Sequence, residues 1–384
     1  MAVLQNLKVH FPGKLIFGNG SLSNLAQEIL QLNCKQALVI TIEPLLLNLQ
    51  SFLNELKANN IIYTVDTSIL QEPTFNDLNR LLQKVQPANP DVVIGIGGGS
   101  VLDIAKLVAV QLDNDQTLPE IIGIGFLKQR SKKLICVPAT SGTGSEVSPN
   151  SILVDDADNQ KKGIISPFLV PDVVYVDPAL TVTVPPAITA ATGLDALTHC
   201  LEAYTNKFAQ PFIDIYAFEG MRLIAANLVK AVHHGDDIEA RTEVAMGSLL
   251  GGFCLGPVNT AAVHALAYPL GSMFHLAHGL SNALLLPFVM EFNIPAATKR
   301  YADVAVALGC QKQVDDLATA YLGVERIKFL IKECGLPATL REVGIPQDAI
   351  TQMARDAMKI TRLLNNNPRE VTLQNAVDIY TAAF

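Results

Sequence analysis

A change of residue pattern at TVPPAIT, residues 183–189, constrains the fold more than any other feature. Before it, short β-branched runs alternate with amphipathic stretches; after it, strand-like runs disappear and Ala/Leu-rich segments with helical spacing take over. Alternating strands and helices are typical of a mostly parallel sheet covered on both faces. Two prolines end an extended run and can start a helix. We therefore predict a Rossmann-like α/β domain over residues 1–184 and an all-helical domain over residues 185–384.

A chain of 384 residues is too long for one ordinary core, which agrees with two domains. The individual elements follow from hydrophobic periodicity. We expect strands at 36–41, 61–65, 91–97, 134–138 and 173–180, an edge strand in FPGKLIFG (11–18), and helices at 21–32, 44–60, 74–86 and 101–112.

Composition excludes several classes of partner. A net charge of -8 without long Lys/Arg runs argues against nucleic acid and anionic membranes. The six cysteines are scattered without a CxxC pair, and the start of the chain lacks a signal-peptide pattern, so we expect a reduced, cytoplasmic protein. Residues 244–290 contain no Asp, Glu, Lys or Arg, but their histidines, asparagines, prolines and glycines would be costly in lipid. We interpret this stretch as buried core helices.

The segment DVVIGIGGGSVLDIAK, residues 91–106, places glycines between an apolar strand and an amphipathic helix. Glycine lets the backbone approach a ligand closely, and the helix N-terminus presents free N–H groups to an anion. The pattern therefore favours a pyrophosphate loop at the carboxyl end of a parallel strand. A plain structural turn is the alternative, whereas a flexible linker disagrees with the flanking elements.

A second polar loop, PATSGTGSE at 138–146, follows another apolar strand. Loops of Ser, Thr and Gly are common, but two such loops after strands of one sheet support a shared cofactor. An acid after an early strand would hold the ribose hydroxyls and select NAD over NADP. Glu43 follows Ile42 there, but an exposed acid before Pro44 at a helix start is the simpler interpretation. The choice between NAD and NADP stays open.

The run GLDALTHCLEAY, residues 193–204, carries Asp195 and His199 four positions apart, and so on one face of a helix. His264 and His278 lie downstream in the uncharged stretch. A single apolar-face histidine is usually a satisfied core residue, but burying Asp195 without compensation is expensive. One carboxylate and three imidazoles suit Fe²⁺, Zn²⁺, Co²⁺ or Ni²⁺. The sequence therefore predicts a metal site, with a self-satisfied core pair as the alternative.

At these residues the chain resembles iron-containing (group III) alcohol dehydrogenases. GGGSVLDIAK, PATSGTGSEV, ATGLDALTHCLEAY and VHALAYPLGSMFHLAHGLSNALLLP are similar to that family's motifs, and the resemblance extends from FPGKLIFGNGSL to the helical C-terminus. The His-rich motif is highly specific, whereas the glycine motif alone is not. The resemblance implies a dehydroquinate synthase-like fold: a dinucleotide domain, a helical metal-binding domain, and an active site in the cleft between them.

The resemblance also implies roles for individual residues. Asp195, His199, His264 and His278 match the metal ligands, with His264 and His278 also expected at the catalytic centre. Residues matching the cofactor contacts are Gly97, Gly98, Gly99, Ser100, Asp103, Thr140, Thr143, Lys162 and Leu180, and Lys106 lies in the same helix as Asp103.

Two positions depart from the family pattern. Many relatives carry an Asp where this chain has Ile42, and its absence should relax the discrimination against NADP. Many also carry a second histidine where this chain has Tyr268, which shares a helical face with His264. Tyr268 is therefore a candidate hydrogen-bonding residue near substrate. His275 is a candidate substitute for the missing histidine, or a polar residue at a helix end.

The resemblance implies hydride transfer between NAD(P) and a small primary alcohol or aldehyde, with the cation acting as a Lewis acid. Three neutral histidines and one carboxylate around a divalent cation leave a net positive site, as an alkoxide requires. Alternatives are a metal-free oxidoreductase similar to maleylacetate reductase, a dehydroquinate synthase-like lyase, and a metal-dependent hydrolase, which leaves the glycine loop unexplained. The edge strand and the uncharged helices also make a homodimer the expected assembly.

Overall fold

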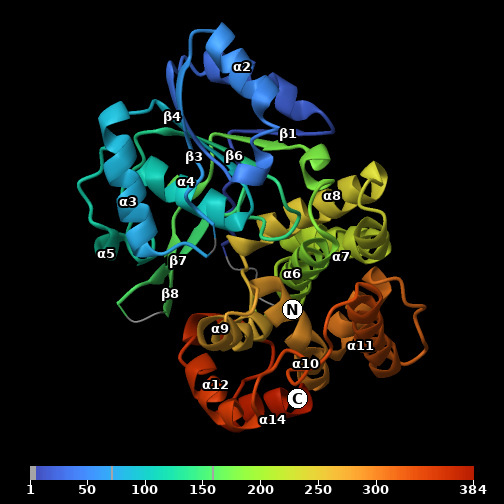
Figure 1. Ribbon diagram of the computed structural model, residues 1–384. Coiled ribbons are helices and arrows are strands. Elements are labelled where there is room, and N and C mark those ends of the chain that lie inside the picture. The colour runs from blue at the N-terminus through green and yellow to red at the C-terminus, as the bar shows by residue number, and fades with distance from the viewer. Residues whose placement is uncertain (1–5, 71, 158–159) are drawn as a thin grey trace. The chain divides into compact units, whose positions relative to one another are not determined.

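The structure is a computed structural model that describes residues 6–70, 72–157 and 160–384. The chain forms two compact units (Figure 1). One unit comprises residues 10–140 and 144–182, and the other comprises residues 141–143 and 183–384 together with the N-terminal residues 6–9. The first is built on a parallel sheet and the second is helical, so the predicted fold class is confirmed.

The α/β unit is organised around a six-stranded sheet in the order β1-β9-β6-β4-β2-β3. Every neighbouring pair in this sheet is parallel. The predicted edge strand forms β1, and the glycine-rich segment begins at the end of β4, inside the sheet. The strands are β1 (Lys14–Phe17), β2 (Gln36–Ile40), β3 (Ile62–Asp66), β4 (Val92–Gly97), β6 (Lys133–Pro138) and β9 (Val173–Val176).

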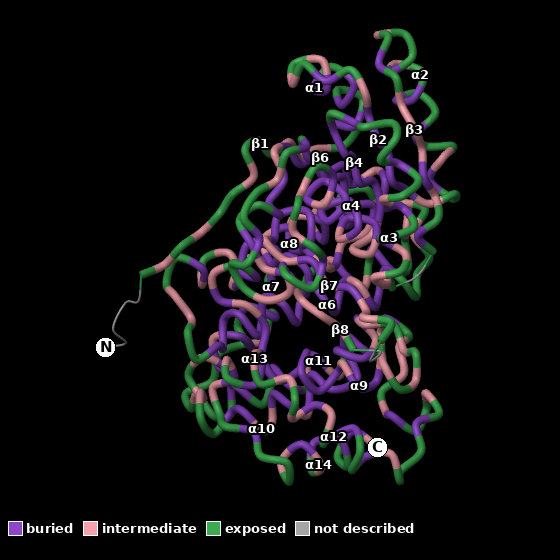
Figure 2. Tube along the Cα trace, turned by 90° about the vertical axis from the view of Figure 1, so that its left-hand side faces the viewer, coloured by how far each residue is buried: buried purple, intermediate pink, exposed green. Residues whose placement is uncertain are grey.

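Helices cover both faces of this sheet. Val39 and Ile94 pack with α1 (Leu25–Gln31) and α2 (Gln50–Ala58). Their chain neighbours Leu38 and Val93 point to the opposite face and pack with α3 (Phe75–Val85) and α4 (Gly99–Gln111). This alternation is the period of two that strands impose on their side chains. Figure 2 shows β4 and α4 traced largely as buried chain.

Three elements of the α/β unit differ from the prediction. The helix expected over 44–60 is shorter, because the chain first forms a 3-10 turn at Glu43–Leu45 and α2 begins only at Gln50. The strand expected over 173–180 ends at Val176, because Pro178 starts a 3-10 helix whose N-cap is Asp177. A small second sheet, β5-β8-β7, was not expected. It contains β5 (Gly123–Ile124), β7 (Asn150–Asp155) and β8 (Gln160–Ile165), with β7 and β8 antiparallel.

The short helices of the α/β unit complete its connections. They are α5 (Leu118–Ile121) and the 3-10 segments η1 (Ser21–Asn24), η2 (Glu43–Leu45), η3 (Gln86–Ala88), η4 (Pro167–Leu169) and η5 (Pro178–Thr181).

The helical unit is packed around α6, which begins at Pro186, the second residue of the double proline, and is buried along most of its length. Helices α7, α8 and α10 pack against it. The helices are α6 (Pro186–Thr205), α7 (Pro211–His233), α8 (Ile238–Leu255), α9 (Ala262–Phe274), α10 (His278–Ala307), α11 (Asp316–Glu333), η6 (Gln347–Ala349), α12 (Ile350–Ala357), α13 (Thr361–Leu364) and α14 (Leu373–Ala382).

Among the residues that the structure describes, α10 alone has the length and hydropathy of a membrane-spanning helix. In its most apolar window 61% of the residues are buried within the protein. The core helix of a globular protein passes the same test, and α10 packs against α6, α9 and α11. Its composition is therefore weak evidence for a membrane span.

Candidate active site

One face of α6 carries the first two predicted ligands. Asp195 and His199 are one helical turn apart and only 2% and 5% exposed. The Nε2 atom of His199 lies 3.8 Å from Oδ1 of Asp195. Gly251 lets α8 pack closely against α6 at this position, since a Cβ there would lie 3.1 Å from Sγ of Cys200 and 3.3 Å from the carbonyl oxygen of Ala196.

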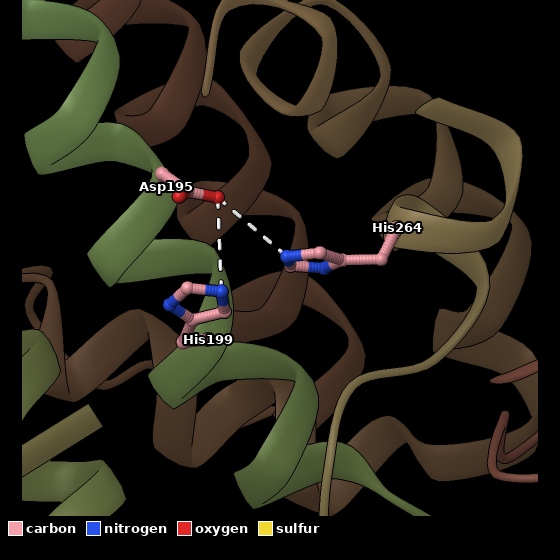
Figure 3. Close-up of side chains that lie close together, drawn as sticks. All are labelled: Asp195, His199 and His264. Carbon is pink, nitrogen blue, oxygen red and sulfur yellow. Dashed lines mark ion pairs between the residues drawn. The ribbon is translucent and has the colours of Figure 1, made fainter. Parts of the chain in front are cut away.

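Two other helices bring the remaining histidines to the same carboxylate oxygen. His264, on α9, places Nε2 3.5 Å from Oδ1 of Asp195, and His278, the first residue of α10, places Nε2 3.7 Å from it. Figure 3 shows His199 and His264 directed toward Asp195. The structure therefore brings all four predicted residues together around one oxygen atom.

Gly279 explains how α10 comes so close. A Cβ at Gly279 would lie 2.2 Å from the carbonyl oxygen of Ala191 on α6 and 3.3 Å from Cβ of Asp195. Such separations exclude any side chain without a shift of the backbone. The glycine after His278 thus sets the distance between the fourth histidine and α6.

This donor set fits a divalent first-row metal ion. In a tetrahedral site with metal–ligand bonds of about 2.1 Å, neighbouring ligand atoms lie about 3.4 Å apart. The three Nε2–Oδ1 separations of 3.5 to 3.8 Å are close to that spacing. Asp195, His199 and His264 are buried, while the His278 side chain is 28% exposed. The cluster is therefore open on the side of His278.

The protonation equilibria agree with a cluster that attracts positive charge. Burial alone would raise the pKa of Asp195, but the imidazoles of His199 and His278 outweigh it and hold this pKa well below its usual range. Burial lowers the pKa of His199. For His264, burial also lowers the pKa, yet the Glu202 and Asp195 carboxylates raise it to about 9. A cation bound between Asp195 and His264 would thus replace the proton that the two carboxylates stabilise on His264.

Glu202 is a functional candidate that the sequence analysis missed. It is 3% exposed, and its Oε2 accepts a hydrogen bond of 2.6 Å from Nδ1 of His264. Its Oε1 accepts one of 2.6 Å from the backbone N–H of Val263. Glu202 follows His199 by three residues, so helical spacing on the motif itself was the available signal. Its carboxylate also changes the expected charge: with Asp195 it balances a divalent cation, so the site is not net positive.

Asn282 is the second missed residue, four positions after His278 on α10. Its Nδ2 lies 2.6 Å from Oδ1 of Asp195, 3.1 Å from Nε2 of His264 and 3.3 Å from Nε2 of His278. An amide has two N–H donors, so it cannot satisfy three acceptors. Its own Oδ1 is buried without a hydrogen-bond partner. Asn282 therefore contacts three of the four candidate ligands with one amide nitrogen.

The other two catalytic candidates lie differently. Tyr268 is on α9 one turn after His264, and its ring centroid is 6.0 Å from that of His278. It therefore lies on the same face as the cluster, as helical spacing predicts. His275 is exposed and adopts the left-handed conformation (φ 55°) at the C-cap of α9. His275 is thus a polar residue at a helix end, one of the two roles that its sequence context predicts.

The glycine loop has the geometry of an anion-binding helix start. β4 ends at Gly97, and α4 begins at Gly99 with Ser100 in its first turn. Gly98 is the N-cap and makes no side-chain capping bond. A Cβ at Gly97 would lie 2.8 Å from Val101, so this glycine is required by packing, whereas one at Gly98 would meet only Thr140, at 3.5 Å. Space for a ligand is therefore at Gly98.

The other residues predicted to contact the cofactor lie in different elements of the structure. Thr140 lies beside Gly98 in the α/β unit, and Thr143 groups with the helical unit. Lys162 is in β8, opposite Leu153 of β7. Leu180 is a buried core residue of η5. Asp103 is bonded to Ser145 and to the backbone of Ile152.

The end of β2 bears on the choice of dinucleotide. Ile42 is partly buried and packs against the cores on both faces of the sheet. Glu43 is exposed in the first turn of η2, as expected for an acid at a helix start.

A glycine loop on a parallel sheet and a cluster of three histidines and a carboxylate are together the features of a metal-dependent nicotinamide dehydrogenase. The similarity of the chain to known protein families agrees with this class of enzyme. The family model described as "Iron-containing alcohol dehydrogenase" matches residues 12–178, and "Fe-containing alcohol dehydrogenase family, C-terminal" matches residues 189–384. The chain belongs to the iron-containing alcohol dehydrogenase family. It is an oxidoreductase of alcohols and aldehydes linked to a nicotinamide cofactor, and the family implies a divalent metal.

Its relatives differ in substrate. Long-chain-alcohol dehydrogenase 1 of Geobacillus thermodenitrificans (strain NG80-2) is 39% identical over 98% of this chain and 96% of that protein. Sulfoacetaldehyde reductase of Bilophila wadsworthia (strain 3_1_6) is 31% identical over 97% of each. A solved 1,3-propanediol oxidoreductase superposes with a TM-score of 0.95 at 31% identity, covering 99% of this chain and all of the other. Family membership therefore fixes the reaction type and leaves the alcohol open.

Proposed function

We propose that this protein is a metal-dependent alcohol dehydrogenase and aldehyde reductase whose cation is held by Asp195, His199, His264 and His278. The observation that carries the proposal is the convergence of three Nε2 atoms within 3.5 to 3.8 Å of one oxygen of Asp195. Among first-row metals, Fe²⁺ is the proposed resident ion and Zn²⁺ the main alternative, since imidazole and carboxylate ligands suit both.

When bound, the cation supplies a Lewis acid for the substrate oxygen and the nicotinamide supplies the hydride. The residues of the chain do the rest. Glu202 holds Nδ1 of His264, so that the lone pair of Nε2 faces the site. Asn282 orients Asp195 through its amide. His278 lies at the open side of the cluster, where Tyr268 also faces, and these two are the proposed neighbours of the substrate.

The dinucleotide is proposed to bind at the glycine loop, residues 97–100, with Thr140 and Thr143 of the second loop as further contacts. The uncapped start of α4 supplies N–H groups for the pyrophosphate. Because Ile42 is apolar and carries no charge, the chain has no carboxylate at that position to repel a 2′-phosphate. We therefore expect both NADH and NADPH to serve, with Lys162 and Leu180 as peripheral contacts.

The proposed substrate is a small, uncharged primary alcohol or its aldehyde. Residues 244–290, which contribute His264, Tyr268 and His278, contain no Asp, Glu, Lys or Arg to neutralise a charged substrate. The proposed assembly is a homodimer, for which β1 offers a strand at the edge of its sheet. The six free cysteines suit a cytoplasmic location.

The test combines metal content with turnover. Protein purified without added metal should contain nearly one iron or zinc per chain and oxidise NADH and NADPH with small aldehydes. Asp195→Ala and His264→Ala should lose both metal and turnover, whereas His234→Ala, an exposed histidine on the same unit, should lose neither. Turnover that persists in metal-free protein and in both ligand variants would overturn the assignment.

A further inference from the structure

Lys106 is a fully buried lysine in the middle of α4, at 0% exposure. Its ammonium donates hydrogen bonds of 2.9 Å to the carbonyl oxygen of Ser148 and 2.8 Å to that of Asn150. Burial lowers the pKa of Lys106, while the nearby Asp103 opposes that shift. Removing an ammonium from water is costly, and the two hydrogen bonds to backbone carbonyls offset part of that cost.

Asp103 lies three residues earlier on the same helix and bonds to the same segment of chain. Its Oδ1 accepts a hydrogen bond of 2.5 Å from Oγ of Ser145, and its Oδ2 accepts one of 2.9 Å from the backbone N–H of Ile152. Its backbone carbonyl accepts a further one of 3.1 Å from Oγ of Ser151. Both carboxylate oxygens of Asp103 are thus already bonded within the protein.

These bonds join the two polar loops. Helix α4 begins at the glycine loop, and residues 145–152 run from the end of the second loop into the first half of β7. Asp103 and Lys106 therefore form a brace between the element that starts at one cofactor loop and the segment that ends the other. Glu146, 3% exposed, adds a second carboxylate near the Lys106 ammonium.

We propose that Asp103 and Lys106 are positioning residues for the dinucleotide: they hold residues 145–152 against α4, so that both loops face one cofactor. Asp103 acts through Ser145 and Ile152 and does not itself touch the cofactor. The inference rests on the proposed function, because it takes the glycine loop as the dinucleotide site.

A double-mutant cycle separates an indirect role from direct contact. The Kd for NADH, followed by its fluorescence, is measured for wild type, Asp103→Asn, Ser145→Ala and the double variant. If Asp103 acts through Ser145, each single variant weakens NADH binding, about tenfold for Asp103→Asn and about threefold for Ser145→Ala, on the scale of one or two lost hydrogen bonds. The double variant should then bind no more weakly than Asp103→Asn alone.

Lys106→Met gives a second, independent measurement, because it keeps the aliphatic stem and removes the ammonium. It should raise the Kd for NADH and the KM for NADH together by about tenfold, while kcat at saturating NADH stays within about twofold. Asp113→Asn is the matched control, since Asp113 pairs with Lys132 near the end of α4 and makes no bond to the braced segment. A role in folding alone would lower Tm in these variants and leave the Kd unchanged.

Gly98→Ala shows which of two proposals has failed: the role of the Asp103–Lys106 brace, or the location of the dinucleotide site at the glycine loop. If Gly98→Ala weakens NADH binding while Asp103→Asn, Ser145→Ala and Lys106→Met leave it unchanged in folded protein, the brace is overturned. If the effects of Asp103→Asn and Ser145→Ala multiply in the double variant, Asp103 does not act through Ser145, and the proposed route is overturned. If none of these variants changes the Kd, Gly98→Ala included, the glycine loop is not the dinucleotide site and the proposed function fails at that point.

Discussion

Glu202 adds a second buried carboxylate to the candidate metal centre, beside that of Asp195. It bonds Nδ1 of His264 and the backbone of Val263, and so fixes which nitrogen of the imidazole is free for a cation. Carboxylate partners of metal-binding histidines typically contribute 10- to 100-fold to metal affinity. Glu202 therefore affects both the orientation of His264 and the net charge of the site.

Glu202→Gln should weaken metal binding by about 10- to 100-fold, because one amide oxygen cannot replace two carboxylate oxygens that accept separate N–H groups. Competition between the protein and a coloured chelator for Co²⁺ or Zn²⁺ measures this without any turnover. The control is Glu219→Gln, at a partly exposed residue that pairs with Arg222 on α7, and it should leave the metal affinity unchanged. Equal affinity in wild type and Glu202→Gln would remove Glu202 from the metal centre.

Glu146 gives the α/β unit a pH dependence of its own. Burial raises its pKa from 4.5 to about 7. The folded state therefore binds more protons than the unfolded state between these values, and the free energy of unfolding falls as pH rises from about 4.5 to 7. Below that range the stabilisation is fully present, and above pH 7 it is lost.

Glu146→Gln stays neutral and removes this loss. Relative to wild type, its free energy of unfolding should increase by about 1–3 kcal/mol between pH 5 and pH 8. Urea denaturation at several pH values measures the difference. Parallel stability curves for the two proteins would show that Glu146 does not titrate in this range.

At the scale of elements, the two glycines between β4 and α4 have different roles: Gly97 is required by packing, and Gly98 leaves space for a ligand. Gly97→Ala should destabilise the α/β unit by about 1–3 kcal/mol, since its Cβ would collide with Val101. Gly98→Ala should leave stability within about 0.5 kcal/mol, because its φ of -76° suits any residue and its Cβ meets only Thr140.

For NADH binding we expect the reverse: among variants that fold, Gly98→Ala should weaken binding more than Gly97→Ala does. The new methyl group at position 98 would occupy the proposed ligand space, so Gly98→Ala should raise the Kd for NADH at least tenfold. Thermal unfolding and NADH fluorescence on the same samples test both halves. A Gly98→Ala protein that is stable and binds NADH normally would move the cofactor away from this loop.

The same elements show how far the sequence could predict the fold. β4 and α4 were predictable because an apolar run, glycines and a periodic helix follow one another without ambiguity. β7 and β8 were not, because their polar residues hide the alternation: in β8, QKKGII, only Ile164 is buried. The face shared by Asp195 and His199 followed from helical spacing, as the position of Glu202 would have done. The approach of His278 depends on Gly279 packing against Ala191, which no local pattern contains.

At the scale of the whole molecule, all four candidate metal ligands belong to one of the two compact units. A ligand that binds only the folded state stabilises it by RT ln(1 + [L]/Kd), about 2.7 kcal/mol at 100 times the Kd. Metal should therefore stabilise the helical unit directly. Proteins with two units need not unfold in a single step, so the two transitions can respond separately.

Removal of metal by a chelator should lower the unfolding temperature of the helical unit by about 5–10 °C, and excess Zn²⁺ or Fe²⁺ should restore it. Asp195→Asn keeps the shape of the side chain and removes its charge, so its unfolding temperature should be insensitive to both treatments. His234→Asn, an exposed histidine on the same unit, should respond like wild type. Calorimetry with and without chelator measures the shifts. If Asp195→Asn and wild type shift equally, the stabilising ion binds elsewhere, and Asp195 and His199 are instead a core pair that satisfies itself.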